Sequence, residues 1–86
     1  MMEIVYTPTF VRQYGKLPTS LREEARSKIA LFQKDPQTPA LRVHKLKGKL
    51  QGYHSFRVNY RYRIIFEYDS SDTVAFLQIG DHAVYG

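Results

Sequence analysis

The sequence contains no cysteine, which excludes disulfide bonds and thiolate metal sites. It also lacks the run of about 20 apolar residues that a membrane-spanning helix requires. Its N-terminus shows no basic region followed by an apolar stretch, so no signal peptide is expected. These absences predict a cytoplasmic protein with no membrane partner, and a length of 86 residues fits one small domain spanning 1–86.

Acidic residues are absent from one long segment of the chain. No Asp or Glu occurs from Leu41 to Arg63, although Lys and Arg are frequent there, and the formal net charge of the chain is +5. Such a balance favours a polyanionic partner, either nucleic acid or an acidic protein. A solvated basic surface is the alternative, but segregation over so long a segment favours a binding surface.

Motifs for metal binding or covalent catalysis are also missing. His44, His54 and His82 lie on different segments without H-x-H or H-x-x-x-H spacing, and the surrounding positive charge opposes cation binding. Gly48-Lys49 lacks the remainder of a phosphate-binding loop, and no G-x-S-x-G nucleophile motif occurs. We therefore expect no metal site and no cofactor.

Two amphipathic helices are predicted in the N-terminal half. The first begins with Thr7 as the N-cap, followed by proline at the first helical position, and extends to about Tyr14. The second begins with a capping box formed by Ser20 and Glu23 and ends at Asp35, which precedes a proline. Their apolar positions are Phe10, Val11, Tyr14, Leu21, Ala25, Ile29 and Phe32.

Tyr53–Tyr68 alternates in the manner of a β-hairpin with one apolar and one cationic face. A three-residue turn at 59–61, with Asn59 in a left-handed conformation, keeps the two faces separate, whereas a two-residue turn mixes them. The favoured register places Arg57 opposite Arg63, an arrangement of like charges that indicates an anionic partner. The apolar face comprises Phe56, Val58, Tyr62, Ile64 and Phe66, and the cationic face comprises Arg57, Arg61 and Arg63.

Two further strands complete the predicted fold. Glu3–Tyr6 is expected to form a short strand, and Thr73–Ile79 a strand buried on both faces within the sheet and ended by Gly80. The order of elements predicts an α+β domain with an N-terminal strand and a two-helix hairpin. The hairpin is expected to pack on one face of a mostly antiparallel sheet of about four strands. The other face would remain open for binding.

The side chains of this basic region suit a phosphodiester. Arginines can bind phosphate oxygens, lysines can form a phosphate-tracking rim, and histidines can move protons. RNA needs no external nucleophile, because its own 2′-OH can attack the adjacent phosphorus. Two alternatives stay open: His54 could be a histidine on the packed face, and the arginines could bind acidic protein. The residues concerned are Arg57, Arg61, Arg63, Lys45, Lys47, Lys49, His54 and His82, with Tyr53, Tyr60, Tyr62 and Tyr85 as base-stacking candidates.

Several short motifs resemble the RelE/ParE superfamily of type II toxins over nearly the whole chain. They are H-K-L-K-G at His44–Gly48, L-x-G-Y at Leu50–Tyr53, Y-R-I-I-F-E-Y at Tyr62–Tyr68 and I-G-D-H-x-x-Y at Ile79–Tyr85. The resemblance implies a RelE-like, microbial-ribonuclease-type fold. It also implies a ribosome-dependent endonuclease that cleaves A-site mRNA and so inhibits translation.

The resemblance assigns four candidate catalytic residues. Arg63 would stabilise the transition state, and Arg57 would transfer a proton or bind phosphate. His82 would act as an acid or phosphate contact, and Tyr85 would stack on the mRNA base. The surrounding RNA-binding candidates are His44, Lys45, Lys47, Lys49, His54 and Arg61.

Two branches of the superfamily bear on these assignments. The H-x-L-x-G context of His44 is similar to the YafQ-type branch, in which the position of Arg61 often carries a carboxylate. The general base is therefore open between His54, Arg57 and a neutralised neighbour. A ParE-like inhibitor of DNA gyrase and a non-catalytic, antitoxin-binding remnant are the alternative functions.

The resemblance also implies a partner, an acidic antitoxin that forms a hetero-oligomer with the toxin and covers the basic face. An edge strand at Glu3–Tyr6 or Tyr53–Asn59 would be available to it.

Overall fold

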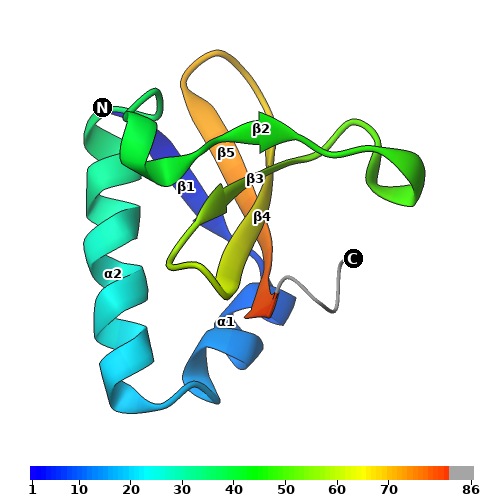
Figure 1. Ribbon diagram of the computed structural model, residues 1–86. Helices are drawn as coiled ribbons and strands as arrows, with labels where there is room; N and C mark the ends of the chain where they lie inside the picture. The colour runs from blue at the N-terminus through cyan, green and yellow to red at the C-terminus, as the bar shows by residue number, and fades with distance from the viewer. Residues whose placement is uncertain (82–86) are drawn as a thin grey trace.

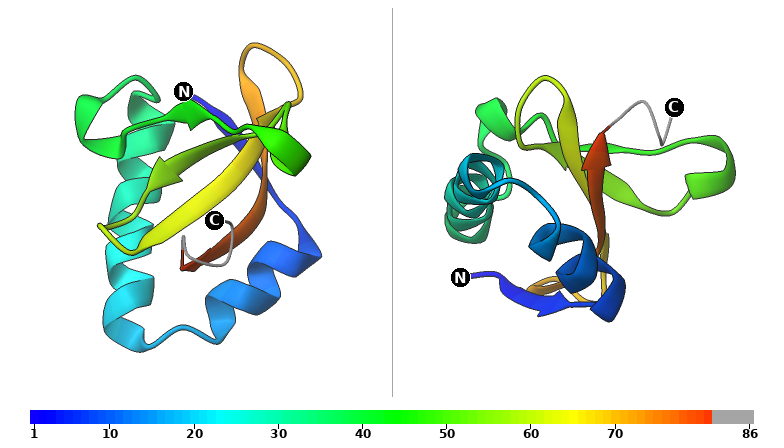
Figure 2. Two further views of the ribbon diagram at one scale, coloured as in Figure 1. Left: turned by 45° about the vertical axis from the view of Figure 1, so that its right-hand side comes forward. Right: turned by 90° about the horizontal axis from the view of Figure 1, so that it is seen from below.

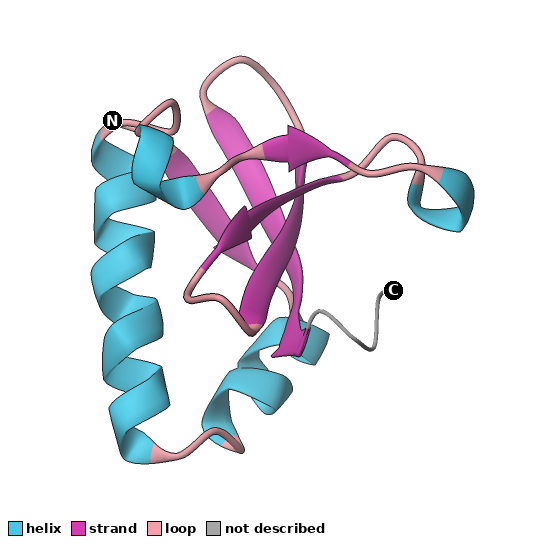
Figure 3. Ribbon diagram, viewed as in Figure 1, coloured by secondary structure: helices cyan, strands magenta, loops and turns pink. Residues whose placement is uncertain are grey.

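The chain folds into a five-stranded sheet with two helices, as seen in a computed structural model that describes residues 1–81 (Figures 1 and 3). The strand order is β1-β5-β4-β3-β2, with β1 parallel to β5 and the other pairs antiparallel. The helices and strands are β1 (Glu3–Tyr6), α1 (Pro8–Gly15), α2 (Thr19–Lys34), β2 (His44–Lys45), β3 (His54–Arg57), β4 (Tyr62–Tyr68) and β5 (Thr73–Asp81), and the 3₁₀ turns are η1 (Pro39–Leu41) and η2 (Gly48–Leu50). The predicted α+β fold is confirmed, with β2 as one strand beyond the four expected.

The two helices begin in different ways. Thr7 caps α1 as predicted, because its Oγ1 accepts a hydrogen bond from the amide of Phe10 at 3.3 Å. The capping box predicted at Ser20 is wrong, since α2 begins at Thr19 after Pro18 and has no side-chain cap.

Val11 was expected on the apolar side of the first helix, but its side chain is exposed rather than packed on the core.

Both helices cover the same face of the sheet through aromatic contacts. Phe32 of α2 stacks on Phe56 of β3 with ring centroids 4.7 Å apart, and it meets Phe66 of β4 edge-on. Phe10 of α1 lies against Phe76 of β5, at 5.4 Å. Figure 2 shows α2 end-on beside the sheet, with the segment around η2 projecting away from it. One face of the sheet is therefore buried by the helices, as predicted.

The β3–β4 hairpin has the predicted register. Phe56 lies opposite Ile64, Arg57 opposite Arg63, and the amide of Val58 donates to the carbonyl of Tyr62. The prediction of a left-handed Asn59 is wrong, because its φ is not positive. Instead, the Oδ1 atom of Asn59 accepts hydrogen bonds from the backbone amides of Arg61 and Tyr62.

Asn59 shapes the turn through its side chain. Its Oδ1 accepts from the amides of Arg61 and Tyr62, each at 2.8 Å, and its Nδ2 donates to Glu24 of α2 at 2.8 Å. Lys28 of α2 also donates to the carbonyl of Val58, at 2.9 Å. The turn is thus held in place by α2.

Strand β5 continues further than expected. Its position between β1 and β4 agrees with the prediction, but the strand runs through Gly80 to Asp81, so the expected end at Gly80 is wrong. Gly80 pairs with Arg63, and extended backbone accommodates glycine when neighbouring strands supply the hydrogen bonds. A register shift between Ile65 and Phe66 allows Phe76 and Ile79, three residues apart, to lie among the buried core residues.

The sheet edges are β1 and β2. Strand β3 is interior, because β2 pairs with it, so the prediction of an edge at Tyr53–Asn59 is wrong for this strand. Strand β1 is an edge, as expected. No helix within residues 1–81 has the length and apolar character to cross a membrane.

Candidate anion-binding site

A small pocket lies on the face of the sheet that the helices leave uncovered. Its volume is about 210 Å³. Because strand residues alternate between faces, the burial of Phe56 against the helices places Ser55 and Arg57 on the opposite face. We call this the cationic pocket; it is lined by Arg42, His44, Ser55, Arg57 and Arg63.

The centre of the cationic pocket is the Arg57–Arg63 pair. The two residues are direct partners across β3 and β4, and both are half-buried. Within residues 1–81, no carboxylate forms an ion pair with either guanidinium. On its other side Arg63 pairs with Gly80, which has no side chain. Like charges directly opposite each other on neighbouring strands repel, so the pair is suited to an anion that both guanidinium groups can contact.

His44 is oriented by the backbone of Arg42. Its Nδ1 lies 3.0 Å from the carbonyl oxygen of Arg42, and a carbonyl can only accept, so Nδ1 carries the proton. In this tautomer Nε2 is the ring nitrogen that can accept a proton. Arg42 itself is left-handed, with φ 50° and ψ 49°, a strained conformation for a residue with a side chain. Sequence reasoning missed Arg42, and its place in the basic segment was the only signal.

Ser55 is the buried polar residue of the pocket. Its exposed fraction is 1%, and its Oγ has no hydrogen-bond partner within the part of the chain that the structure describes. It pairs with His44 on one side and with Ile65 on the other. Sequence reasoning also missed Ser55, although it shares the strand parity of Arg57.

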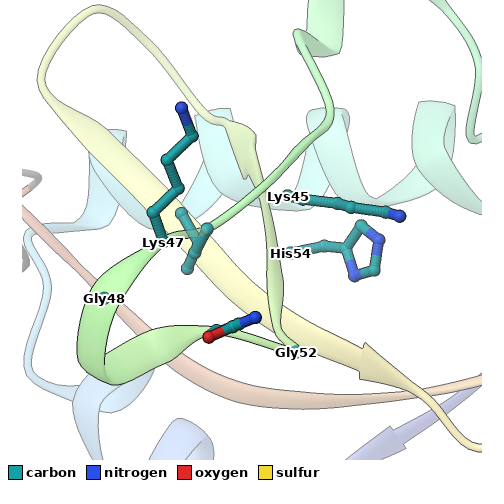
Figure 4. Close-up of a pocket in the computed structure, with 7 residues that line it drawn as sticks. Lys45, Lys47, Gly48, Gly52 and His54 are labelled. Atoms are coloured by element: carbon teal, nitrogen blue, oxygen red, sulfur yellow. The ribbon is translucent and has the colours of Figure 1, made fainter.

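Three of the predicted RNA-binding residues lie elsewhere, in a second pocket of about 670 Å³ beneath the segment around η2. Figure 4 shows Lys45 and His54 extending side by side, with Lys47 on the neighbouring segment. Lys45 is the partner of His54 across β2 and β3, so alternation separates both from His44 and Arg57. We call this second pocket the arch pocket; Lys49 lies in η2 and lines neither pocket. The expected RNA-binding set is therefore split between two places.

His54 occupies the packed-face position that the sequence left open. Its ring stacks on Phe66 at 5.5 Å and meets Tyr68 edge-on at 5.1 Å. Burial lowers the pKa of His54, and the positive charges of Lys45 and His44 lower it further. His54 is thereby biased towards the neutral form, which makes it a weak phosphate contact.

Arg61 is not part of the cationic pocket. Its Nε lies 2.8 Å from Oδ2 of Asp81, and the hydrogen bond and charge of that carboxylate raise the pKa of Arg61. The predicted three-arginine face is therefore reduced to Arg57 and Arg63, joined by Arg42. The role of Arg61 in RNA binding stays a prediction.

The remaining two catalytic candidates, His82 and Tyr85, lie outside the described residues. Within residues 1–81, no group of three or more His, Asp or Glu side chains is arranged to hold a metal ion. The polar groups that line the cationic pocket are guanidinium groups, an oriented imidazole and a buried hydroxyl.

Comparison with known proteins identifies relatives of this chain. Residues 14–82 match the HigB-like toxin family, described as RelE-like toxins of the type II toxin-antitoxin system HigB. No curated protein matches the sequence significantly.

Several solved structures with the same fold are toxins or toxin-antitoxin complexes. YafQ from E. coli superposes with a TM-score of 0.78 at 16% identity, covering 100% of both chains. The YoeB/ParE toxin from Agrobacterium tumefaciens gives 0.75 at 21%, covering 94% of this chain and 99% of its own. The toxin-antitoxin complex RelBE2 from Mycobacterium tuberculosis gives 0.72 at 24%, covering 93% of this chain and 96% of that one. At these identities the likeness establishes the fold.

Proposed function

Because the chain belongs to the HigB-like family of RelE-like toxins of type II toxin-antitoxin systems, we propose that it is an endoribonuclease. Its substrate is mRNA in the ribosomal A site, and its cleavage of that mRNA inhibits translation. The observation that carries the proposal is the Arg57–Arg63 pair, two cross-strand partners that line one pocket and have no carboxylate partner within residues 1–81. A phosphodiester is the anion that such a pair accommodates on RNA.

The reaction uses the nucleophile that RNA already contains. A base removes the proton of the 2′-OH, and the oxygen attacks the adjacent phosphorus. The bond from phosphorus to the 5′-oxygen breaks, and an acid protonates that oxygen. The products are a 2′,3′-cyclic phosphate and a free 5′-OH. Negative charge accumulates on the non-bridging oxygens, where Arg57 and Arg63 stabilise it.

His44 is the general base that the geometry favours. The carbonyl of Arg42 accepts the Nδ1 proton, which leaves Nε2 as the ring nitrogen that can accept the proton of the 2′-OH. His54, one of the earlier candidates, is less suited, since its ring is stacked on Phe66 at the helix-covered side of the sheet. His82 as the acid and Tyr85 as the base-stacking residue stay sequence-based proposals.

An acidic antitoxin is the proposed partner in a hetero-oligomer. Two observations support it: the net charge of +5 and the exposed edge of β1, where Val5 and Tyr6 are 49% and 48% exposed. A further support is that the M. tuberculosis neighbour is itself a toxin-antitoxin complex. Antitoxin residues that occupy the cationic pocket would block access of RNA.

The test is the Arg63→Ala variant in translating cells and on programmed ribosomes. Loss of one transition-state contact lowers the rate of mRNA cleavage by about 10²- to 10³-fold, and growth inhibition disappears. Arg12→Ala, which removes an exposed arginine from α1, is the matched control and retains full toxicity.

The same experiment separates the competing functions. Wild-type toxin cuts mRNA within codons only when ribosomes are present. A DNA damage response without translation arrest would instead indicate a ParE-like gyrase inhibitor. No growth phenotype at all would indicate a non-catalytic, antitoxin-binding remnant. Full toxicity of Arg63→Ala would remove this residue from the site.

A further inference from the structure

Ser55 presents a buried hydroxyl that the fold leaves unsatisfied. The residue is 1% exposed, and its Oγ has no hydrogen-bond partner among residues 1–81. A buried hydroxyl without a partner costs free energy, and folded proteins satisfy most such groups. Its cost is therefore unexplained by the fold.

The surroundings of Ser55 are chemically one-sided. The side chains that line the pocket with it are three arginines, which only donate hydrogen bonds, and His44, whose Nδ1 donates to the carbonyl of Arg42 and whose Nε2 is the remaining acceptor. Among the described residues that line the cationic pocket, Ser55 alone carries a hydroxyl. A hydroxyl among donors complements a ligand that carries several acceptor oxygens.

Position also matters, because Ser55 is two residues from Arg57 and hence on the same face of β3. Its cross-strand partners are His44 and Ile65, so it sits between the oriented imidazole and a buried aliphatic side chain. A phosphate drawn to Arg57 and Arg63 therefore arrives beside Ser55. Ser55 lines the same pocket as both arginines.

We propose that Ser55 Oγ donates a hydrogen bond to a non-bridging oxygen of the phosphodiester held in the cationic pocket. The identity of the anion as RNA rests on the proposed function. The anion contact itself does not, because it follows from the buried hydroxyl and the arginines. Ser55 is thus a substrate-binding residue whose hydroxyl is kept unpaired until the ligand arrives.

Ser55→Ala tests the proposal, because stability and binding should move in opposite directions. Removal of the unsatisfied hydroxyl raises the thermal unfolding midpoint of the free protein. Inorganic phosphate stabilises the wild-type protein against unfolding, and its dissociation constant, obtained from the dependence of the midpoint on phosphate concentration, becomes about tenfold larger in the variant. Single-turnover cleavage on programmed ribosomes slows by about the same factor. Ser71→Ala, at an exposed position in the β4–β5 turn, is the control that changes none of these quantities.

Each outcome bears on the proposal. An unchanged phosphate dissociation constant in Ser55→Ala overturns it, and so does a wild-type protein that phosphate does not stabilise. If phosphate binding weakens as expected but wild-type toxin cuts no mRNA, the anion contact stands and the proposed function fails. Ser55→Cys, which nearly preserves the volume but is a weak donor, gives the same comparison if the alanine variant does not fold.

Discussion

Phe56 and Arg57 are neighbours on β3, yet they lie in opposite environments. Phe56 is fully buried and stacked on Phe32 of α2. Arg57 faces the cationic pocket, beside a like charge and an unpaired hydroxyl. One side of the strand therefore contributes stability, and the other side carries interactions that a folded chain does not need. Their difference indicates that the second face is built for a ligand, because like charges and unsatisfied groups oppose folding.

The largest expected effect breaks the packed face. Phe56→Ala should lower the free energy of unfolding by about 3–5 kcal/mol, since it removes a buried ring and leaves a cavity. Arg57→Ala should change it by no more than about 0.5 kcal/mol, because a repulsion is lost along with the side chain. Urea denaturation of the two variants measures the contrast directly. A comparable loss in both would show that the two faces do not differ in this way.

The next effect concerns the turn that keeps the faces separate. Asn59→Ala removes hydrogen bonds to Arg61, Tyr62 and Glu24 and should cost about 1–2 kcal/mol of stability. Asn59→Gly is the sharper variant. A left-handed requirement would make glycine stabilising, whereas a side-chain requirement makes glycine as harmful as alanine. Equilibrium unfolding of both variants distinguishes the two explanations.

A smaller effect should appear as a pH dependence that belongs to the packed face. Burial lowers the pKa of His54 in the folded state, so the unfolded chain binds a proton more readily. Stability from this group is complete above about pH 6.5, the ordinary histidine value. It declines as the pH falls from there towards the lowered pKa of the folded state. Chemical denaturation between about pH 5 and pH 8 should show this slope in the wild type and a weaker slope in His54→Gln. An equal slope in both would assign the effect to other groups.

The smallest expected effect is at the exposed ion pair beyond the hairpin. Arg61 is 63% exposed and Asp81 24%, so water and salt screen their interaction. Arg61→Gln should leave the urea midpoint unchanged within error at both low and high salt. A clear, salt-sensitive loss would show that this pair helps to hold the end of β5 in place.

The sequence predicted the hairpin well, because one rule determines it. Alternation assigns each strand residue of 53–68 to one face of the sheet. Only a turn with an odd number of residues then places arginines opposite arginines. The register of Arg57 with Arg63 followed from that rule alone. The helices were predicted for a similar reason, since their apolar positions repeat at helical spacing.

The failures came from interactions that are not local. Strand β2 has only two residues, His44 and Lys45, and exists because β3 pairs with it. The prediction ended β5 at Gly80, because the pairing of Gly80 with Arg63 of β4 joins residues that are distant in the sequence. Composition likewise grouped Lys45, Lys47 and His54 with the arginines, although pairing across β2 and β3 directs them to the arch pocket.

The candidate site was predicted in part. Arg57, Arg63 and His44 were expected near an anion, and the fold brings them together in one pocket. Arg42 was missed because its left-handed backbone is fixed by the end of η1. Ser55 was missed because a lone serine in a strand carries no signal until its burial and missing partner are known.

The parallel pairing of β1 with β5 has a consequence for the order in which the chain folds. Glu3 lies opposite Thr73 and Tyr6 opposite Phe76, so the first strand to be synthesised must wait for the last to emerge from the ribosome. Closing so long a loop is an entropic cost that precedes any gain from the contacts it forms. Helices and the β3–β4 hairpin can form earlier, from local contacts. During synthesis, the apolar residues of β1 therefore stay without their sheet partner until β5 is available to receive them.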